Sequence, residues 1–233
     1  MEWSIWRNNL RLLRHYIPRN DFYIIYVSMF KITEPQWGVD LLKSLFAWMQ
    51  ASSFWSYRIP VLADIFVFTY PIYLLALYIY GMAKKKIYYK IAALYIVAGT
   101  ALSFIVNIGI QFFVDKIRPN VVLWLADLKH ETILNKFMPS SSFPSDHAAL
   151  TMSIAMMSLF WGIKNKDKKF LRFGGILIIF SLVTWFARIS SWVHWPTDII
   201  GGSIVGIIIP LVLMWRPIYK FGTRVAEKIT KII

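Results

Sequence analysis

The stretch IAALYIVAGTALSFIVNIGIQFFV, residues 91–114, is an apolar run that contains no charged side chain. As a helix it would rise about 36 Å, more than the roughly 30 Å hydrocarbon core of a bilayer. One such run could be a buried helix of a soluble protein, but the chain has four more, which makes that alternative untenable. We therefore predict an all-α, polytopic transmembrane bundle with five spans: Leu62–Tyr80, Ile91–Val114, Ala148–Ile163, Phe170–Ala187 and Ile199–Trp215.

The composition excludes a soluble or disordered chain. Hydrophobic residues make up 58% and charged residues 16% of the chain, whereas soluble domains have about 45–50% and about 25%. The absence of cysteine excludes disulfides, thiol catalysis and cysteine-based zinc sites. Residues 1–233 are predicted to form one integral-membrane domain, because the sequence contains no repeat, linker or low-complexity tract.

The net charge of +14 indicates an anionic membrane surface rather than a nucleic acid as the partner, given the apolar content. Connections 81–90 and 164–172 and the tail 216–233 carry 14 Lys and Arg residues together, whereas connections 115–147 and 188–198 carry five. The positive-inside rule places the basic tail in the cytoplasm. The poorly charged connections then face outward, to the periplasm or cell exterior.

Residues 61–215 are predicted to form the main helix bundle, whereas residues 1–60 leave two questions open. An apolar stripe on residues 3–17, flanked by arginines, indicates an amphipathic interfacial helix, or else a surface helix packed on the bundle. Residues 21–57 could contain a sixth span or lie flat on the membrane. The stripe consists of Trp3, Trp6, Leu10, Leu13 and Ile17.

Polar residues gather where the spans meet the outer face, and ionisable residues in such places are usually functional. In Pro144-Ser145-Asp146-His147, Ser145 suits the N-cap of the helix that follows, with Asp146 in its first turn. A helix N-terminus favours a phosphate, and an imidazole beside it suits general acid catalysis. The alternative is plain helix capping.

His194 and Asp198 are four residues apart, so the carboxylate can face the imidazole and fix its tautomer. Arg188, on the same outer segment, can grip phosphate oxygens. The alternative is a structural His–Asp pair with Arg188 reaching lipid headgroups. We predict no metal and no cofactor, because arginines would surround the only available ligands, which are Asp146, His147, His194 and Asp198.

The set Arg118-Pro119, Pro144-Ser145-x-His147 and Arg188-x5-His194-x3-Asp198 resembles the three-part signature of the type-2 phosphatidic acid phosphatase superfamily. The resemblance covers about residues 60–215 and implies metal-independent hydrolysis of lipid phosphates or diphosphates. Vanadium haloperoxidases have a similar site, but a membrane chain argues against them. The resemblance implies that His194 is the nucleophile and forms a phosphohistidine, that Asp198 orients it, that His147 protonates the leaving group, and that Arg118, Ser145 and Arg188 hold the phosphate.

Three positions depart from the family pattern: Gln111 replaces a lysine, Asp146 a glycine and Ala187 a serine. Asp146 and the small size resemble bacterial undecaprenyl-diphosphate phosphatases of the bacitracin-resistance type. We therefore count Asp146 among the phosphate-binding residues. Lys116 is a candidate to replace the missing lysine at the distal phosphate, or else it pairs with Asp115 in solvent or reaches headgroups.

The resemblance leads us to expect conversion of undecaprenyl diphosphate to undecaprenyl phosphate. Lipid A 1-phosphate and phosphatidylglycerol phosphate are alternative substrates of similar chains. Transfer of the phosphoryl group from undecaprenyl diphosphate to lipid A is a third reaction to consider. A membrane protein that keeps the pocket only for binding, such as a transporter, is the non-enzymatic alternative.

Overall fold

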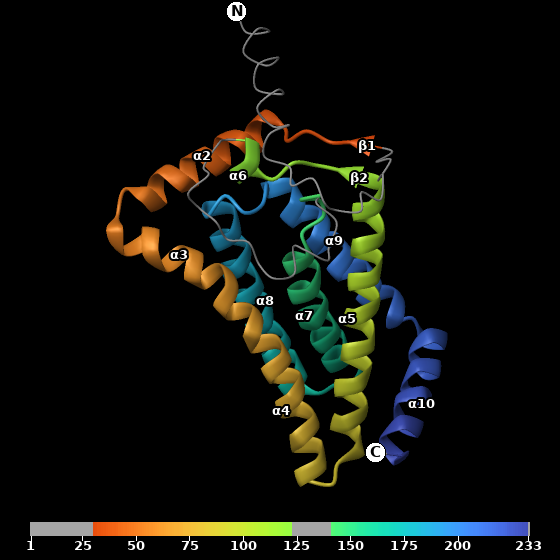
Figure 1. The fold of residues 1–233 in the computed structure, drawn as a ribbon. Coiled ribbons are helices and arrows are strands. Elements are labelled where there is room, and N and C mark those ends of the chain that lie inside the picture. The colour runs from red at the N-terminus through yellow and green to blue at the C-terminus, as the bar shows by residue number, and fades with distance from the viewer. Residues whose placement is uncertain (1–29, 123–140, 233) are drawn as a thin grey trace, which may run out of the picture.

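A computed structural model describes residues 30–122 and 141–232 of the chain. Within these ranges the protein is a bundle of α-helices with one short parallel strand pair, which confirms the predicted all-α polytopic class (Figure 1). The predicted amphipathic segment 3–17 lies outside the described residues. The elements are β1 (Phe30–Lys31), α2 (Gln36–Gln50), α3 (Ser53–Ile65), η1 (Phe66–Phe68), α4 (Thr69–Ala83), α5 (Ile87–Phe113), β2 (Val114–Asp115), α6 (Pro119–Val122), α7 (Asp146–Asn165), α8 (Lys168–Ser190), α9 (Pro196–Leu213) and α10 (Arg216–Ile232).

Four helical segments of the described chain are long and apolar enough to cross a membrane. They contain four of the five predicted runs to within two residues at the ends of the runs, and the first is the continuous helical stretch formed by α3, η1 and α4. The remaining run, Ala148–Ile163, lies in α7, which is not among these four segments. A count of five spans therefore stays a prediction. The four segments are Ser53–Ala83, Ile87–Phe113, Lys168–Ser190 and Pro196–Leu213.

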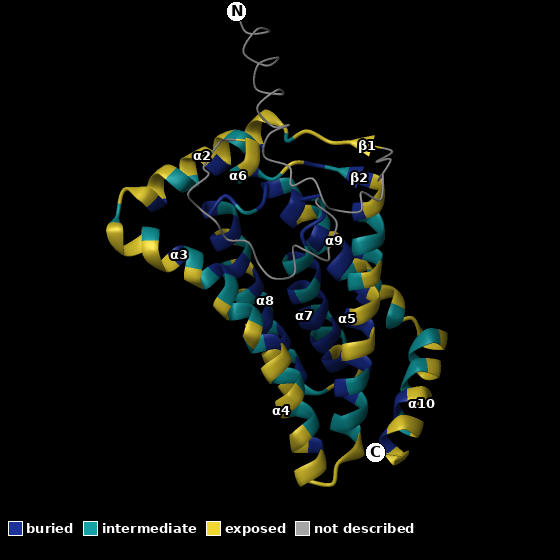
Figure 2. Ribbon diagram, viewed as in Figure 1, coloured by how far each residue is buried: buried dark blue, intermediate teal, exposed yellow. Residues whose placement is uncertain are grey.

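The position of α7 in the bundle explains its more polar composition. It packs against α5, α8 and α9, and Figure 2 shows that it is largely buried. A helix surrounded by other helices has no need of a lipid-facing apolar surface, and small polar side chains can bond across the interface. One such contact joins α5 to α7, where the hydroxyls of Ser103 and Ser153 are 2.9 Å apart.

The outer helices present large apolar side chains away from the protein. On α9 these residues recur every three or four positions, the spacing of one helix face. In water such a stripe would be a large exposed apolar patch, whereas in a bilayer it faces acyl chains. On α9 the stripe consists of Ile200, Ile204, Ile208 and Leu211, which are 48–58% exposed.

Helix α2 lies in the stretch 21–57, where a sixth span was possible, and is not among the four segments long and apolar enough to cross a membrane. Helix α2 has 15 residues, which as a helix rise about 22 Å, less than the hydrocarbon core. It lies at the end of the bundle that also carries β1 and β2 (Figure 1). There Leu42 of α2 packs with Trp192 and Trp195 from the α8–α9 connection. Helix α2 therefore covers the segment that contains His194.

Helices α7 and α9 approach each other closely because two glycines face α7. A Cβ atom added at Gly202 would overlap the carbonyl oxygen of Ser145, and one added at Gly206 would lie 2.7 Å from the carbonyl oxygen of Ala149. Small residues spaced four apart let membrane helices pack backbone to backbone. This close approach brings the N-terminus of α7 beside the N-terminus of α9.

We predict that Gly202→Ala destabilises the bundle by about 1–3 kcal/mol, because the added methyl group would force the two helices apart. Gly175→Ala on α8 is the matched control, since a Cβ atom there meets no other atom within 4 Å. Thermal unfolding in detergent would measure both variants. Equal melting temperatures for Gly202→Ala and the wild type would contradict the prediction.

Candidate active site

Three segments far apart in the sequence meet at one end of the bundle. They are residues 114–118 after α5, residues 141–147 at the start of α7, and residues 188–198 between α8 and α9. Hydrogen bonds to backbone carbonyl oxygens connect them. Ser142 N donates to Lys116 O (2.8 Å), Ser145 N donates to Asp198 O (3.0 Å), and Trp195 Nε1 donates to Ile117 O (2.7 Å). The clusters predicted to share one face are therefore in direct contact.

The start of α9 places His194 and Asp198 against each other. Pro196 occupies the first turn, where its missing N–H costs nothing. Asp198 Oδ2 accepts a hydrogen bond from Trp195 N at 2.9 Å and lies 3.4 Å from His194 Nδ1. A carboxylate at Nδ1 favours the tautomer with the proton on that nitrogen. The lone pair of His194 is then on Nε2.

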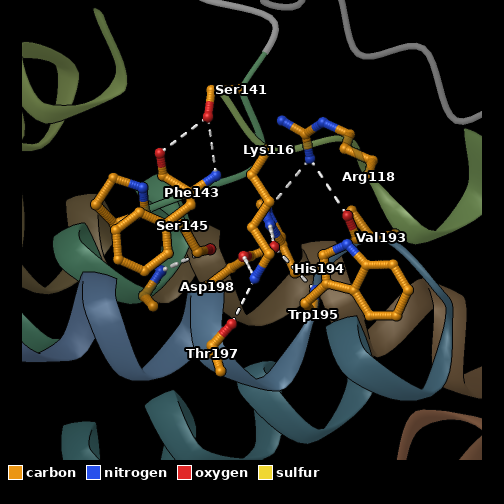
Figure 3. Close-up of polar contacts among 12 residues, drawn as sticks. Lys116, Arg118, Ser141, Phe143, Ser145, Val193, His194, Trp195, Thr197 and Asp198 are labelled. Carbon is orange, nitrogen blue, oxygen red and sulfur yellow. Dashed lines mark hydrogen bonds and ion pairs between the residues drawn. The ribbon is translucent and has the colours of Figure 1, made fainter. Parts of the chain in front are cut away.

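Arg118 covers the Nε2 side of His194 (Figure 3). Its Nη1 atom lies 3.4 Å from His194 Nε2 and 3.3 Å from the carbonyl oxygen of Val193. A guanidinium beside Nε2 can hold the oxygens of a phosphoryl group that this nitrogen attacks. The imidazole therefore has a carboxylate on one side and a cation on the other.

The surroundings keep His194 neutral. Burial is the main cause that lowers the pKa of His194 well below its usual value, and the positive charges of Arg118 and Arg188 lower it further. The side chain is 3% exposed. An imidazole with a lowered pKa keeps its Nε2 lone pair at neutral pH, which a nucleophile requires.

The N-terminus of α7 is built as the sequence predicted. Ser145 is its N-cap, and its Oγ accepts a hydrogen bond from Ala148 N at 3.4 Å. Asp146 lies in the first turn. His147 follows, and its electrostatic neighbours are Arg188, His194 and Arg118. The candidate acid, the candidate nucleophile and both arginines therefore lie near one another.

Arg188 is held from one side by a residue that sequence reasoning missed. Its Nη1 atom donates to Asp64 Oδ1 (2.9 Å) and to Ala63 O (3.4 Å), both from α3. Its Nε atom is buried and has no hydrogen-bond partner among the described residues. Because an unpaired buried donor is costly, the Nε edge is available for an anion. A single carboxylate inside the run Leu62–Tyr80 was the sequence signal for this contact.

Asp146 accepts hydrogen bonds from two side-chain amides of α5. Its Oδ1 atom accepts hydrogen bonds from Asn107 Nδ2 (2.7 Å) and Gln111 Nε2 (2.9 Å). The same two amides donate to the carbonyl oxygen of Pro144. Gln111 therefore donates a neutral hydrogen bond to Asp146, and Asn107, one turn earlier, does the same. Gln111 and Asp146, which stand where the family has a lysine and a glycine, therefore contact each other.

Lys116 has different neighbours from those that the sequence led us to expect. Instead of pairing with Asp115 or reaching solvent, it is 2% exposed and lies against Glu34, Asp198 and Thr197. Glu34 comes from the N-terminal segment, where β1 pairs with β2. Sequence reasoning missed this partner because Glu34 and Lys116 are 82 residues apart.

Within the part of the chain that the structure describes, no three His, Cys, Asp or Glu side chains are grouped so as to hold a metal ion. The site's charged groups are instead the arginines, lysine and carboxylates described above. Their arrangement can bind a phosphate group and offer it a neutral imidazole.

The chain is similar to proteins of known or assigned activity. Undecaprenyl-diphosphatase BcrC of Bacillus subtilis (strain 168) is 29% identical over 188 residues, which are 75% of this chain and 87% of that protein. Putative undecaprenyl-diphosphatase YbjG of Escherichia coli (strain K12) is 34% identical over 67 residues, 29% of this chain and 30% of YbjG.

A crystal structure of LpxE from Aquifex aeolicus has a similar fold. Its TM-score is 0.50 at 22% sequence identity, and the match covers 78% of this chain and 98% of LpxE. The family model of the PAP2 superfamily matches residues 92–221, more than half of the chain and all three motifs. The chain therefore belongs to the PAP2 superfamily, as its motifs indicated.

Proposed function

We propose that the protein is a metal-independent lipid phosphatase that converts undecaprenyl diphosphate to undecaprenyl phosphate through a phosphohistidine. The observation that carries the proposal is the buried imidazole of His194, with Asp198 at Nδ1 and Arg118 at Nε2. This arrangement provides a neutral nucleophile and a positive charge where the phosphoryl oxygens would lie.

The reaction has two steps. His194 Nε2 attacks the terminal phosphorus, and the bond from that phosphorus to the bridging oxygen breaks. The negative charge of the bound diphosphate offsets Arg118 and Arg188, so that His147 can hold a proton and give it to the leaving lipid phosphate. Water then attacks the phosphohistidine, returns a proton to His147 and releases inorganic phosphate. Arg118, Arg188 and the N-terminus of α7 stabilise the charge of the transferring group.

Two observations support undecaprenyl diphosphate over other lipids. The BcrC relative, whose name states that activity, aligns with 75% of this chain. Asp146 of this chain also departs from the family glycine in the way that resembles such enzymes. Lipid A 1-phosphate, phosphatidylglycerol phosphate and transfer to a lipid acceptor are the alternative reactions.

We propose that the site faces the periplasm or cell exterior of a bacterial inner membrane. The basic connection 84–86 between α4 and α5 and the basic helix α10 lie toward the end of the bundle opposite the site (Figure 1). An excess of Lys and Arg marks the cytoplasmic side. The substrate would then be met at the outer leaflet.

A substrate panel tests the proposed function. Purified protein in excess chelator is given undecaprenyl diphosphate, lipid A or phosphatidylglycerol phosphate, and released phosphate is measured with and without an acceptor lipid. We expect release to be fastest from undecaprenyl diphosphate and to be inhibited by vanadate, which can mimic the phosphoryl-transfer transition state. Absence of phosphate release or transfer from every lipid would leave only a binding protein, and a requirement for Mg²⁺ would refute metal independence.

Variants of the two site histidines should differ in their activity toward an aryl phosphate. We predict that His194→Ala and His147→Ala each abolish turnover of the lipid substrate. An aryl phosphate with a good leaving group should partly restore His147→Ala, because its leaving group needs no proton. It should not restore His194→Ala, since no phosphohistidine can form. Equal restoration of both variants would show that the roles are assigned wrongly.

Removing Asp64 should weaken phosphate binding. Without the carboxylate, Arg188 loses its 2.9 Å acceptor and its Nε edge is no longer fixed toward the site. We expect Asp64→Ala to raise KM about tenfold, which corresponds to about 1.4 kcal/mol, with a smaller rise for Asp64→Asn.

Asp40→Asn on α2 is the control for this measurement, because Asp40 is exposed and bonds to Gln36 of its own helix. Its KM should equal that of the wild type. Steady-state kinetics at matched protein stability would decide the matter. An unchanged KM in Asp64→Ala would mean that the ion pair has no part in substrate binding.

A further inference from the structure

Lys116 stands at the centre of a buried chain of charges that reaches the candidate nucleophile. Its Nζ atom lies 2.8 Å from Asp198 Oδ1 and 2.6 Å from Glu34 Oε2. The Thr197 hydroxyl contacts both Lys116 Nζ and the Glu34 carboxylate. The side chains of Lys116, Asp198 and Glu34 are 1%, 0% and 3% exposed. Figure 3 shows Lys116 extending to Asp198 and Thr197.

The ammonium group of Lys116 is surrounded by groups of the protein itself: it donates to Glu34 and Thr197 and forms an ion pair with Asp198. A lysine carries three N–H donors, and Lys116 Nζ has three partners, Glu34, Asp198 and Thr197. Each partner is buried or half-buried with it. This geometry disfavours the role of a ligand to the distal phosphate, which the sequence had left open for this residue.

Asp198 divides its two oxygens between different partners. Oδ2 faces His194 Nδ1 and accepts from Trp195 N, whereas Oδ1 faces Lys116. The lysine therefore fixes the plane of the carboxylate from the side opposite His194. The positive charge of Lys116 also reduces the ability of Asp198 to stabilise a positively charged His194. Glu34 offsets part of that effect, because it pairs with the same ammonium group.

Contacts of the N-terminal segment hold Glu34 beside Lys116. Residues Phe30 and Lys31 pair with Val114 and Asp115, which fixes the chain just before Glu34. Gly38 leaves the space that the Glu34 carboxylate occupies, because a Cβ atom there would overlap it. Glu34 lies outside the residues 92–221 that match the family model, so the family motifs do not account for it.

We propose that Lys116 and Glu34 are positioning residues that act on His194 through Asp198. Lys116 holds Oδ1 so that Oδ2 points at the imidazole, and the balance between Lys116 and Glu34 sets how strongly Asp198 supports positive charge on His194. The proposal rests on the proposed function, in which His194 is the nucleophile.

Removing the positive charge of Lys116 and removing the negative charge of Glu34 should shift the pH dependence of activity in opposite directions. Activity falls at low pH when His194 binds a proton. Lys116→Met removes a positive charge and eases that protonation, so the acid limb of kcat/KM should move to higher pH. Glu34→Gln removes a negative charge, so the limb should move to lower pH. We expect the shift for Lys116→Met to be at least about half a pH unit, since a nearby charge commonly moves a pKa by more than that. The shift for Glu34→Gln should be smaller, because Glu34 lies beyond Lys116 in the series of ion pairs.

The other charged groups near His194 stay unchanged in both variants, so they cannot cause opposite shifts. They come from α7, α8 and the segment after α5 and are His147, Asp146, Arg188 and Arg118. The double variant Lys116→Met/Glu34→Gln removes both charges and leaves no unpaired Glu34. Its limb should lie between those of the single variants, which also provides a test if Lys116→Met alone fails to fold.

The pH profiles are measured with an aryl phosphate and with the lipid diphosphate, and Lys31→Met, at an exposed position of the same segment, is the control. The proposal predicts lower kcat with little change in KM for the Lys116 and Glu34 variants. Unmoved limbs, or limbs that both move the same way, would overturn it. A selective rise in KM for the diphosphate in Lys116→Met would instead make Lys116 a phosphate ligand.

A second readout separates this proposal from the proposed function. NMR titration of labelled histidine reports the protonation of His194, one of four histidines in the chain, without any turnover. If the wild type releases no phosphate from any substrate, the proposed function fails, while opposite shifts of the His194 titration would still support the charge chain. If the wild type is active but His194 titrates at the same pH in the wild type and in all variants, the positioning role of Lys116 and Glu34 is refuted and the proposed function stands.

Discussion

The carboxylate of Asp198 makes contacts on which three parts of the chain depend. Its Oδ2 caps the start of α9 through Trp195 N and faces His194, and its Oδ1 pairs with Lys116. Its backbone oxygen accepts the N–H of Ser145, the N-cap of α7. One residue thus joins the local structure of α9, the segment after α5 and the start of α7. A buried carboxylate with several partners is costly to disturb, so the same contacts that hold the fold also hold the site.

The bundle keeps this polar end in place through the unequal composition of its helices. The outer helices expose apolar side chains where acyl chains would surround them, whereas α7 is enclosed by α5, α8 and α9 and carries Ser153, whose hydroxyl bonds to Ser103 of α5. Glycines on α9 bring its backbone against the start of α7. Packing of this kind fixes the distance between the two helix N-termini that carry Ser145, His147 and Asp198.

The departures from the family motifs make physical sense once they are seen together. Gln111 stands where the family has lysine and Asp146 where it has glycine, and in this protein the amide of Gln111 bonds to the carboxylate of Asp146. A lysine at 111 would meet that carboxylate as an ion pair, whereas Gln111 and Asn107 satisfy it without a charge. The cationic part of the site is then left to Arg118 and to Arg188, which Asp64 orients.

The sequence by itself determined the class of fold, because the length of an apolar run decides whether a helix can cross a bilayer. It also determined the facing of His194 and Asp198 and the capping of α7 by Ser145, since these depend on spacing within one helical turn. Only the tertiary structure decided the partners of Lys116, Arg188 and Asp146. Glu34 and Asp64 reach the site from 82 and 124 residues away, and no local periodicity encodes contacts that arise when separate helices pack against one another.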